Sequence, residues 1–209
     1  MPSQRIAALI VAWSAALWLW GAGIAPAQST DVFLGFTGHI ERQIHQDKQF
    51  FVDAQTCTEW FYKQQSHPDR PKSEGIGFSG RRPEVLPAIH ASDCPGRYPG
   101  GLNAAREDFS STQSALSISL TFYEFALVGD RDDDRLYNAG ELRDVLESFE
   151  LTYDRNRPDS VHLMILTDTF DTLRKTGGLE RLMTGMGTLF EKGYRLSERD
   201  RSTLDQITK

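Results

Sequence analysis

Residues 130–141, with the sequence DRDDDRLYNAGE, carry acidic and amide side chains at a characteristic spacing. Counting Asp130 as position 1, acidic or amide side chains occupy positions 1, 3, 5, 9 and 12, and Asp133 adds a further carboxylate at position 4. Ca²⁺ takes six to eight oxygen ligands at about 2.3–2.6 Å, and this spacing lets a short loop bring its oxygens to one cation. Apolar residues at helical spacing precede the loop up to Leu127 and follow it from Leu142. The segment therefore predicts two helices joined by a cation-binding loop.

This loop resembles the calcium-binding loop of the EF-hand family, and the resemblance covers about residues 120–149. It implies Ca²⁺ as the bound ion. The ligands that it implies are the side chains of Asp130, Asp132 and Asp134, the backbone carbonyl of Leu136, Asn138 directly or through a water, and both carboxylate oxygens of Glu141. Tyr137 takes the apolar position that, in the family, pairs with a second loop through a short strand.

The sequence departs from the family pattern in two places. Arg135 stands where the family has glycine, and a residue with a Cβ loses about 1 kcal/mol in the left-handed conformation needed there. Phe125 and Val128 lie one position earlier than the family's usual apolar pair. These departures predict a weaker site. The alternative interpretation is a solvated acidic turn between two helices.

Residues 179–207 have the outline of a second helix–loop–helix unit. Its loop, Gly193-Tyr194-Arg195-Leu196, is shortened and lacks carboxylates at the early positions. Such a degenerate hand could pair with the first one without binding a cation. An ordinary helical hairpin is the alternative.

The N-terminal residues 1–27 have the order of a signal peptide. Arg5 precedes an apolar stretch at 6–24, which is followed by Ala25-Pro26-Ala27. This order predicts cleavage after Ala27 and a mature chain that starts at Gln28. We therefore expect a periplasmic or secreted protein. A membrane-anchored protein is the alternative, because the apolar stretch is nearly long enough to span a bilayer.

The chain has two cysteines, Cys57 and Cys94. Thiols in an oxidising compartment tend to pair, so export predicts one disulfide between them. They form no CxxC motif, which argues against thioredoxin-like redox chemistry, a zinc ribbon and haem attachment. The bridge would tie down residues 67–101, which are rich in Pro and Gly and are predicted to be a long irregular segment.

Apolar periodicity predicts helices at about 31–65, 109–127, 139–153, 160–173, 179–190 and 197–207. Gly35 and Gly38 predict a kink or break in the first helix. Asp159 or Ser160 is placed to cap the fourth helix, and Ser197 is placed to cap the last one.

No segment shows the alternation of a strand, so the predicted fold class is all-α. The predicted organisation has three parts: a signal peptide at 1–27, an N-terminal helix with the irregular segment at 28–103, and an EF-hand-like helical domain at 104–209.

The charge balance limits the range of possible functions. The 23 Lys and Arg against 29 Asp and Glu give a formal net charge of −6 without any basic run, which argues against nucleic-acid binding. We expect an exported calcium-binding protein in which calcium is a structural part or the protein is a weak calcium sensor. One alternative is an enzyme, or an accessory subunit of one, with a calcium-stabilised fold, although the sequence defines no catalytic grouping. Another is a membrane-anchored interaction protein.

Overall fold

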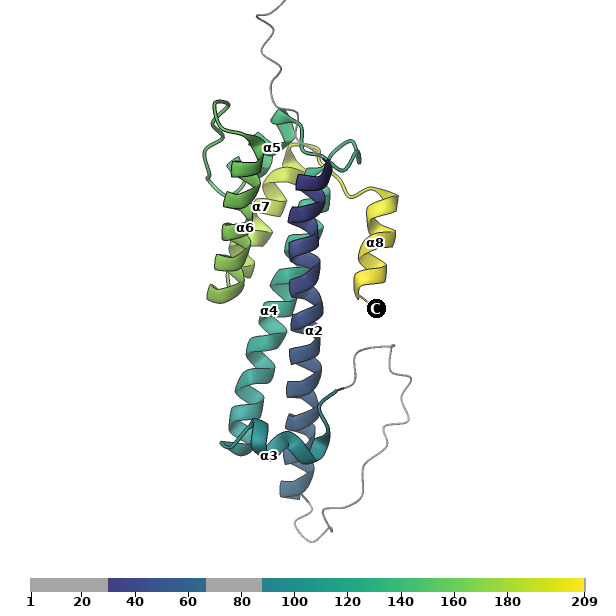
Figure 1. Cartoon of the computed structure of the whole chain (residues 1–209), viewed down its shortest axis with the longest axis vertical. Helices are drawn as coiled ribbons and strands as arrows, with labels where there is room; N and C mark the ends of the chain where they lie inside the picture. The colour runs from purple at the N-terminus through teal and green to yellow at the C-terminus, as the bar shows by residue number, and fades with distance from the viewer. Residues whose placement is uncertain (1–29, 67–87, 209) are drawn as a thin grey trace, which may run out of the picture.

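The computed structural model describes residues 30–66 and 88–208, so the predicted signal peptide at 1–27 and residues 67–87 lie outside the described residues. The described residues form helices and no strand, which confirms the all-α prediction. The helices shown in Figure 1 are α2 (Thr30–Ser66), η1 (Ala91–Asp93), α3 (Cys94–Arg97), α4 (Gly101–Gly129), α5 (Ala139–Glu147), α6 (Asp159–Thr176), α7 (Leu179–Glu191) and α8 (Glu198–Thr208). None of these described helices has an apolar stretch that could cross a bilayer.

Two long helices, α2 and α4, lie side by side and form the axis of the molecule, and α5 to α8 gather around one end of this pair (Figure 1). We call that end, with residues 32–48 and 116–208, the head. The opposite end, with residues 50–66 and 88–109, is the hairpin end. The predicted boundary at 103/104 falls within α4.

Helix α2 is continuous over 37 residues, which corresponds to about 55 Å. It passes through Gly35 and Gly38 without a break, so the predicted break does not occur. Each glycine costs a helix about 1 kcal/mol relative to alanine. Burial of the apolar stripe that includes Phe33, Ile40 and Ile44, all fully buried, outweighs that cost.

The core of the head is built from aromatic side chains of several helices. The ring of Phe122 in α4 is fully buried, and its centroid lies 5.0 Å from that of Phe170 in α6. It also lies 5.6 Å from the ring of Phe125 and 5.9 Å from that of Phe149, which follows α5. Burying one such side chain contributes about 1.5–3 kcal/mol to stability. These rings therefore fix α5 and α6 against the long helix pair.

The predicted disulfide between Cys57 and Cys94 is present at the hairpin end. It joins α2 to α3, and both cysteines are fully buried. The small cluster around it contains Ala54, Tyr98 and Ala105 with the partly buried Trp60, Phe61, Ile89, Ala104 and Phe109.

The chain at 91–97 is helical, which corrects the prediction that all of 67–101 is irregular. The His90 ring accepts the Ser92 N–H at the start of η1. Pro95 lies in the first turn of α3, where the missing N–H is not needed. Residues 88–90 and 98–100 are outside helices, as expected.

Helix α5 ends at Glu147 instead of continuing to 153. Leu151 N–H donates to the Leu146 carbonyl, and Glu150 N–H donates to that of Glu147. Glu150 has φ 62°, so the turn is a Schellman motif with a glutamate in the left-handed position. The sequence at Glu150 carries no glycine signal, which explains why the early end is not evident.

Two other helix boundaries test the predicted caps. The Ser197 hydroxyl accepts the Asp200 N–H at 3.0 Å, which confirms Ser197 as the cap of α8. Pro158, and neither Asp159 nor Ser160, occupies the cap position of α6, and it makes no side-chain capping bond.

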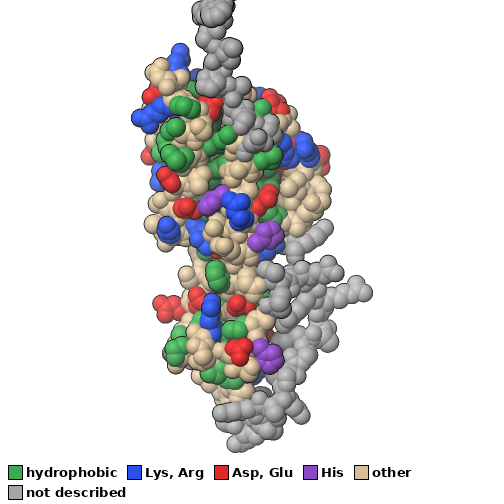
Figure 2. All heavy atoms as spheres, in the orientation of Figure 1, with side chains coloured by type: hydrophobic (Ala, Val, Ile, Leu, Met, Phe, Trp, Pro, Cys, Tyr) green, Lys and Arg blue, Asp and Glu red, His purple; other side chains and the backbone are tan. Residues whose placement is uncertain are grey.

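On the face shown in Figure 2, acidic and basic side chains of the described residues are interspersed, without a continuous basic stripe.

Candidate metal centre

The acidic loop connects the end of α4 to the start of α5 in the head. Asp130, Asp132 and Asp134 each place a carboxylate oxygen within 4.8 Å of the others. Asp130 is only 2% exposed, whereas Asp132 and Asp134 lie open to solvent. The structure therefore brings together the three acids that the sequence places at positions 1, 3 and 5, with one of them anchored in the protein.

Backbone N–H groups fix the first carboxylate of this cluster. Asp130 Oδ1 accepts the Asp134 N–H at 3.2 Å, and Oδ2 accepts the Arg135 N–H at 3.0 Å. Asp134 Oδ1 in turn accepts the Leu136 N–H at 2.9 Å. Arg135 has φ 67°, the left-handed conformation that the family meets with glycine at this position. The loop thus closes around Asp130 despite the side chain at position 6.

Glu141 and Asn138 form a capping box at the start of α5. Asn138 Oδ1 accepts the Glu141 N–H at 3.1 Å and Glu141 Oε2 accepts the Asn138 N–H at 2.9 Å. Glu141 Oε1 accepts the Arg131 N–H at 3.0 Å, so both of its oxygens bind the backbone of the loop. The two residues predicted at positions 9 and 12 therefore lie at the end of the loop where α5 begins, engaged in these bonds rather than in the three-aspartate cluster.

The electrostatics of the loop disfavour its negative charges. Burial raises the pKa of Asp130 to about 6, against the lowering effect of the Arg135 and Asp134 N–H groups, and the charges of Glu141 and Asp134 add to the increase. Burial also raises the pKa of Glu141, and the Asp132 and Asp134 charges contribute. These carboxylates therefore repel one another in a partly desolvated site, where a cation would relieve the repulsion.

Tyr137 does not form the short strand that the family resemblance implies. Its side chain is 1% exposed, and its hydroxyl donates to the Ala126 carbonyl at 2.6 Å. Its ring centroid lies 4.8 Å from that of Phe33 in α2. No strand occurs in residues 30–66 and 88–208, so the side chain anchors the loop in the core instead.

The outer side of the loop contacts the connection between α7 and α8 and the first turn of α8. Arg135 Nη2 lies 2.8 Å from Asp200 Oδ1, and the Asp200 side chain is 1% exposed. The Ser197 hydroxyl lies within hydrogen-bond distance of two carboxylates, 3.0 Å from Asp200 Oδ2 and 3.3 Å from Asp133 Oδ2. The Arg131 guanidinium lies 5.6 Å from the Tyr194 ring centroid. Residues 179–207 thus form two helices whose connection contacts the acidic loop.

The contact between Arg135 and Asp200 was not evident from the sequence. Their positions are far apart in the chain, and no local pattern connects them. The only available signal was the unusual residue at position 6. The structure shows that Arg135 uses its left-handed backbone to reach a buried carboxylate of α8.

Chemically, the loop offers hard oxygen donors and little else. Such donors suit Ca²⁺, Mg²⁺ or Mn²⁺ rather than metals that prefer sulfur or imidazole ligands. The aspartates are supplied by one loop between two packed helices, so their positions depend on the fold of the head. The chain matches no protein-family model, no curated protein and no solved structure in the comparisons made.

Proposed function

We propose that this is an exported calcium-binding protein whose loop at 130–141 is a single EF-hand-like site. The observation that carries the proposal is the convergence of Asp130, Asp132 and Asp134 within 4.8 Å between two helices of the head. Leu136, Asn138 and Glu141 would complete the ligand set that the resemblance implies.

Ca²⁺ is favoured over Mg²⁺ because of the number and flexibility of the available oxygens. Glu141 carries two oxygens on one side chain, and the larger ion accepts such bidentate ligands readily, whereas Mg²⁺ requires a compact octahedron. Glu141 and Asn138 would exchange capping bonds for metal bonds. That exchange, together with the left-handed Arg135, supports weak binding of the kind found in extracellular modules, about 10⁻⁴–10⁻³ M.

The ion would act mainly as part of the structure. The loop joins α4 to α5, and Tyr137 and Asp130 are both buried in the head. A cation there would balance the negative charge of carboxylates that the fold already holds close together. Calcium would therefore stabilise the head by mass action, with the free energy of unfolding rising as its concentration exceeds the dissociation constant.

Thermal unfolding with calcium and with chelator tests the proposal. At 100 times its dissociation constant, calcium should raise the free energy of unfolding by about 2.7 kcal/mol. Mg²⁺ at the same concentration should raise it less. Titration calorimetry gives the dissociation constant that defines this comparison.

Asp132→Ala is the sharpest variant, because the Asp132 side chain is exposed and makes no hydrogen bond or ion pair within the described residues. It should melt like the parent protein in chelator and lose the calcium shift. Glu141→Gln should lose most of the shift while keeping an acceptor for one capping N–H. Glu107→Gln, an exposed change at the hairpin end, is the matched control. Absence of heat and of a melting shift at several millimolar calcium would leave the solvated acidic turn as the correct interpretation.

Export is the second part of the proposal. The disulfide supports it, because stable disulfides are rare in reducing compartments. The intact mass of the protein purified from its own cells should match a chain that starts at Gln28. Recovery of the full-length chain in the membrane fraction would favour the anchored alternative.

A further inference from the structure

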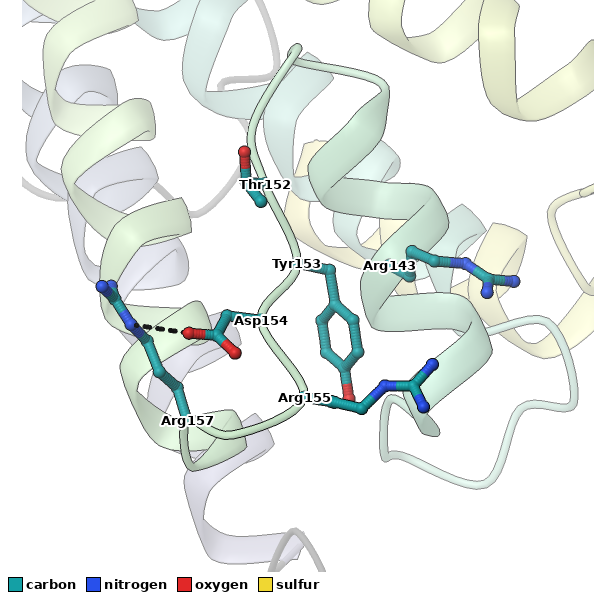
Figure 3. A pocket seen from close by; sticks show the side chains of 6 residues that line it. All are labelled: Arg143, Thr152, Tyr153, Asp154, Arg155 and Arg157. Carbon is teal, nitrogen blue, oxygen red and sulfur yellow. Dashed lines mark ion pairs between the residues drawn. The ribbon is translucent and has the colours of Figure 1, made fainter.

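A hollow of about 480 Å³ lies between α5 and the loop that leads to α6 (Figure 3). It is lined by Arg143, Thr152, Tyr153, Asp154, Arg155 and Arg157. Three arginines against one aspartate give this lining a positive charge, although the whole chain has a formal net charge of −6. The local charge is therefore opposite in sign to that of the protein.

Several donors around the hollow are not engaged by the protein. Arg155 makes no ion pair or hydrogen bond within the described residues, and Arg143 Nε lies 4.0 Å from Glu147 Oε1, the outer limit of an ion pair. In Figure 3 both guanidinium groups lie to one side of the Tyr153 ring. The hydroxyls of Thr152 and Tyr153 also make no hydrogen bond in the described part of the chain. Donors without acceptors in the lining of one hollow favour an anionic ligand.

The backbone that carries these donors is held in place. The Asp154 N–H donates to Nε2 of His162 at 3.1 Å, and the His162 side chain is fully buried. The Tyr153 ring centroid lies 4.8 Å from that of His162. Asp154 Oδ2 lies 3.4 Å from Arg157 Nε, and Figure 3 marks this ion pair with a dashed line. The ion pair holds the side chain of Arg157, the third arginine of the lining. Little ordering of this backbone is therefore needed when a ligand binds.

We propose that this hollow binds a phosphate group, either free or carried by a small molecule. A carboxylate has two oxygens in one plane and is satisfied by a single guanidinium fork. The Arg143 guanidinium from α5 and the Arg155 guanidinium from the loop, with the Tyr153 hydroxyl, suit an anion that presents oxygens in several directions. The hollow is within the range of small-molecule sites, about 300–1,000 Å³. This proposal is independent of calcium binding.

Titration calorimetry at low salt, with inorganic phosphate and with phenyl phosphate as probes, tests it. We expect a dissociation constant of about 1 mM or tighter for at least one probe. Tighter binding of phenyl phosphate would identify the ligand as an ester, and tighter binding of inorganic phosphate would identify free phosphate. Acetate should bind at least tenfold more weakly than the preferred probe.

Arginine variants test whether the phosphate probes bind in the hollow. Arg143→Gln and Arg155→Gln should each weaken binding about fivefold, and together more than either alone. Arg155→Lys should keep part of the affinity, because it retains the charge and loses the fork. Arg106→Gln, an exposed change on α4 at the hairpin end, is the control. Since Arg143 and Arg155 are exposed, all variants should melt like the parent protein.

Two results would overturn the proposal. One is the absence of heat with both probes up to about 20 mM at low salt. The other is binding by the Arg143→Gln, Arg155→Gln double variant that equals binding by the parent protein. A shift of the Arg143 and Arg155 Nε–H resonances on addition of phosphate would support it independently of the calorimetry.

Discussion

The head and the hairpin end of the molecule are stabilised by different means. The head has a large apolar core with stacked and edge-on aromatic rings, and its acidic loop is fixed by hydrogen bonds and ion pairs. The hairpin end has a small cluster around one disulfide between Cys57 and Cys94. Small cores are marginally stable on their own and are commonly supplemented by covalent links. The two ends should therefore respond to different treatments.

The largest effect should follow from Phe122→Ala in the head. Removing a fully buried ring that contacts Phe125, Phe149 and Phe170 should lower the free energy of unfolding by about 3–5 kcal/mol. Phe50→Ala, where the ring is 42% exposed, should cost well under half of that. Denaturant unfolding measures both variants. Equal losses would mean that the aromatic core does not dominate the stability of the head.

The disulfide variant Cys57→Ala, Cys94→Ala tests the opposite end. It should lower the free energy of unfolding by about 2–4 kcal/mol. Amide hydrogen exchange should speed up at 50–66 and 88–109 and remain close to that of the parent protein in the head. If the head exchanged faster as well, the two ends would form one cooperative unit and the contrast between them would fail.

Arg135→Gly examines the outer side of the acidic loop. Glycine relieves the left-handed strain by about 1 kcal/mol, but the change leaves the Asp200 carboxylate, 1% exposed, without the arginine that balances its charge. Breaking a buried ion pair costs about 3–5 kcal/mol, and we expect the lower figure because the Arg135 side chain is 17% exposed. The net loss in chelator should be about 2 kcal/mol. Adding Asp200→Asn to Arg135→Gly should recover part of the lost stability. If Arg135→Gly alone stabilised the protein in chelator, the result would contradict a stabilising ion pair between Arg135 and Asp200.

The smallest effect concerns Asp144, which binds Lys192 Nζ at 2.7 Å and the Tyr194 hydroxyl at 2.8 Å. Burial alone would raise the pKa of Asp144, but these hydrogen bonds outweigh it, and the pKa is lowered. A carboxyl whose pKa is lower in the folded state stabilises the fold above its unfolded pKa, near 4, and loses that contribution as the pH falls. The contribution should be about 0.5 kcal/mol because the pair is partly exposed. The difference between unfolding curves of the parent and Asp144→Asn, from pH 7 to pH 3, should show this loss.

The sequence predicted the features that depend on local or compositional rules. Helical periodicity, the pairing of the only two cysteines and the Ser197 cap are of this kind, and all three occur in the structure. The grouping of Asp130, Asp132 and Asp134 also follows from spacing within one loop. Export and calcium binding remain predictions.

Other features depend on contacts between distant residues and could not be predicted. Arg135 meets Asp200 only because the α7–α8 connection packs against the loop. The early end of α5 depends on a left-handed Glu150, for which no glycine gives a signal. Tyr137 packs against α2 instead of entering a strand because the core of the head accepts its ring. In each case tertiary packing overrides the local pattern.

The disulfide also changes what a single proteolytic cut can do. Cys57 and Cys94 are 37 positions apart, and the bond between them closes that stretch of backbone into a covalent ring. Cleavage of one peptide bond inside the ring opens it without separating the polypeptide into two molecules. The nicked protein would keep both α2 and α4 and would move as one species on a denaturing gel until a reductant releases its two pieces.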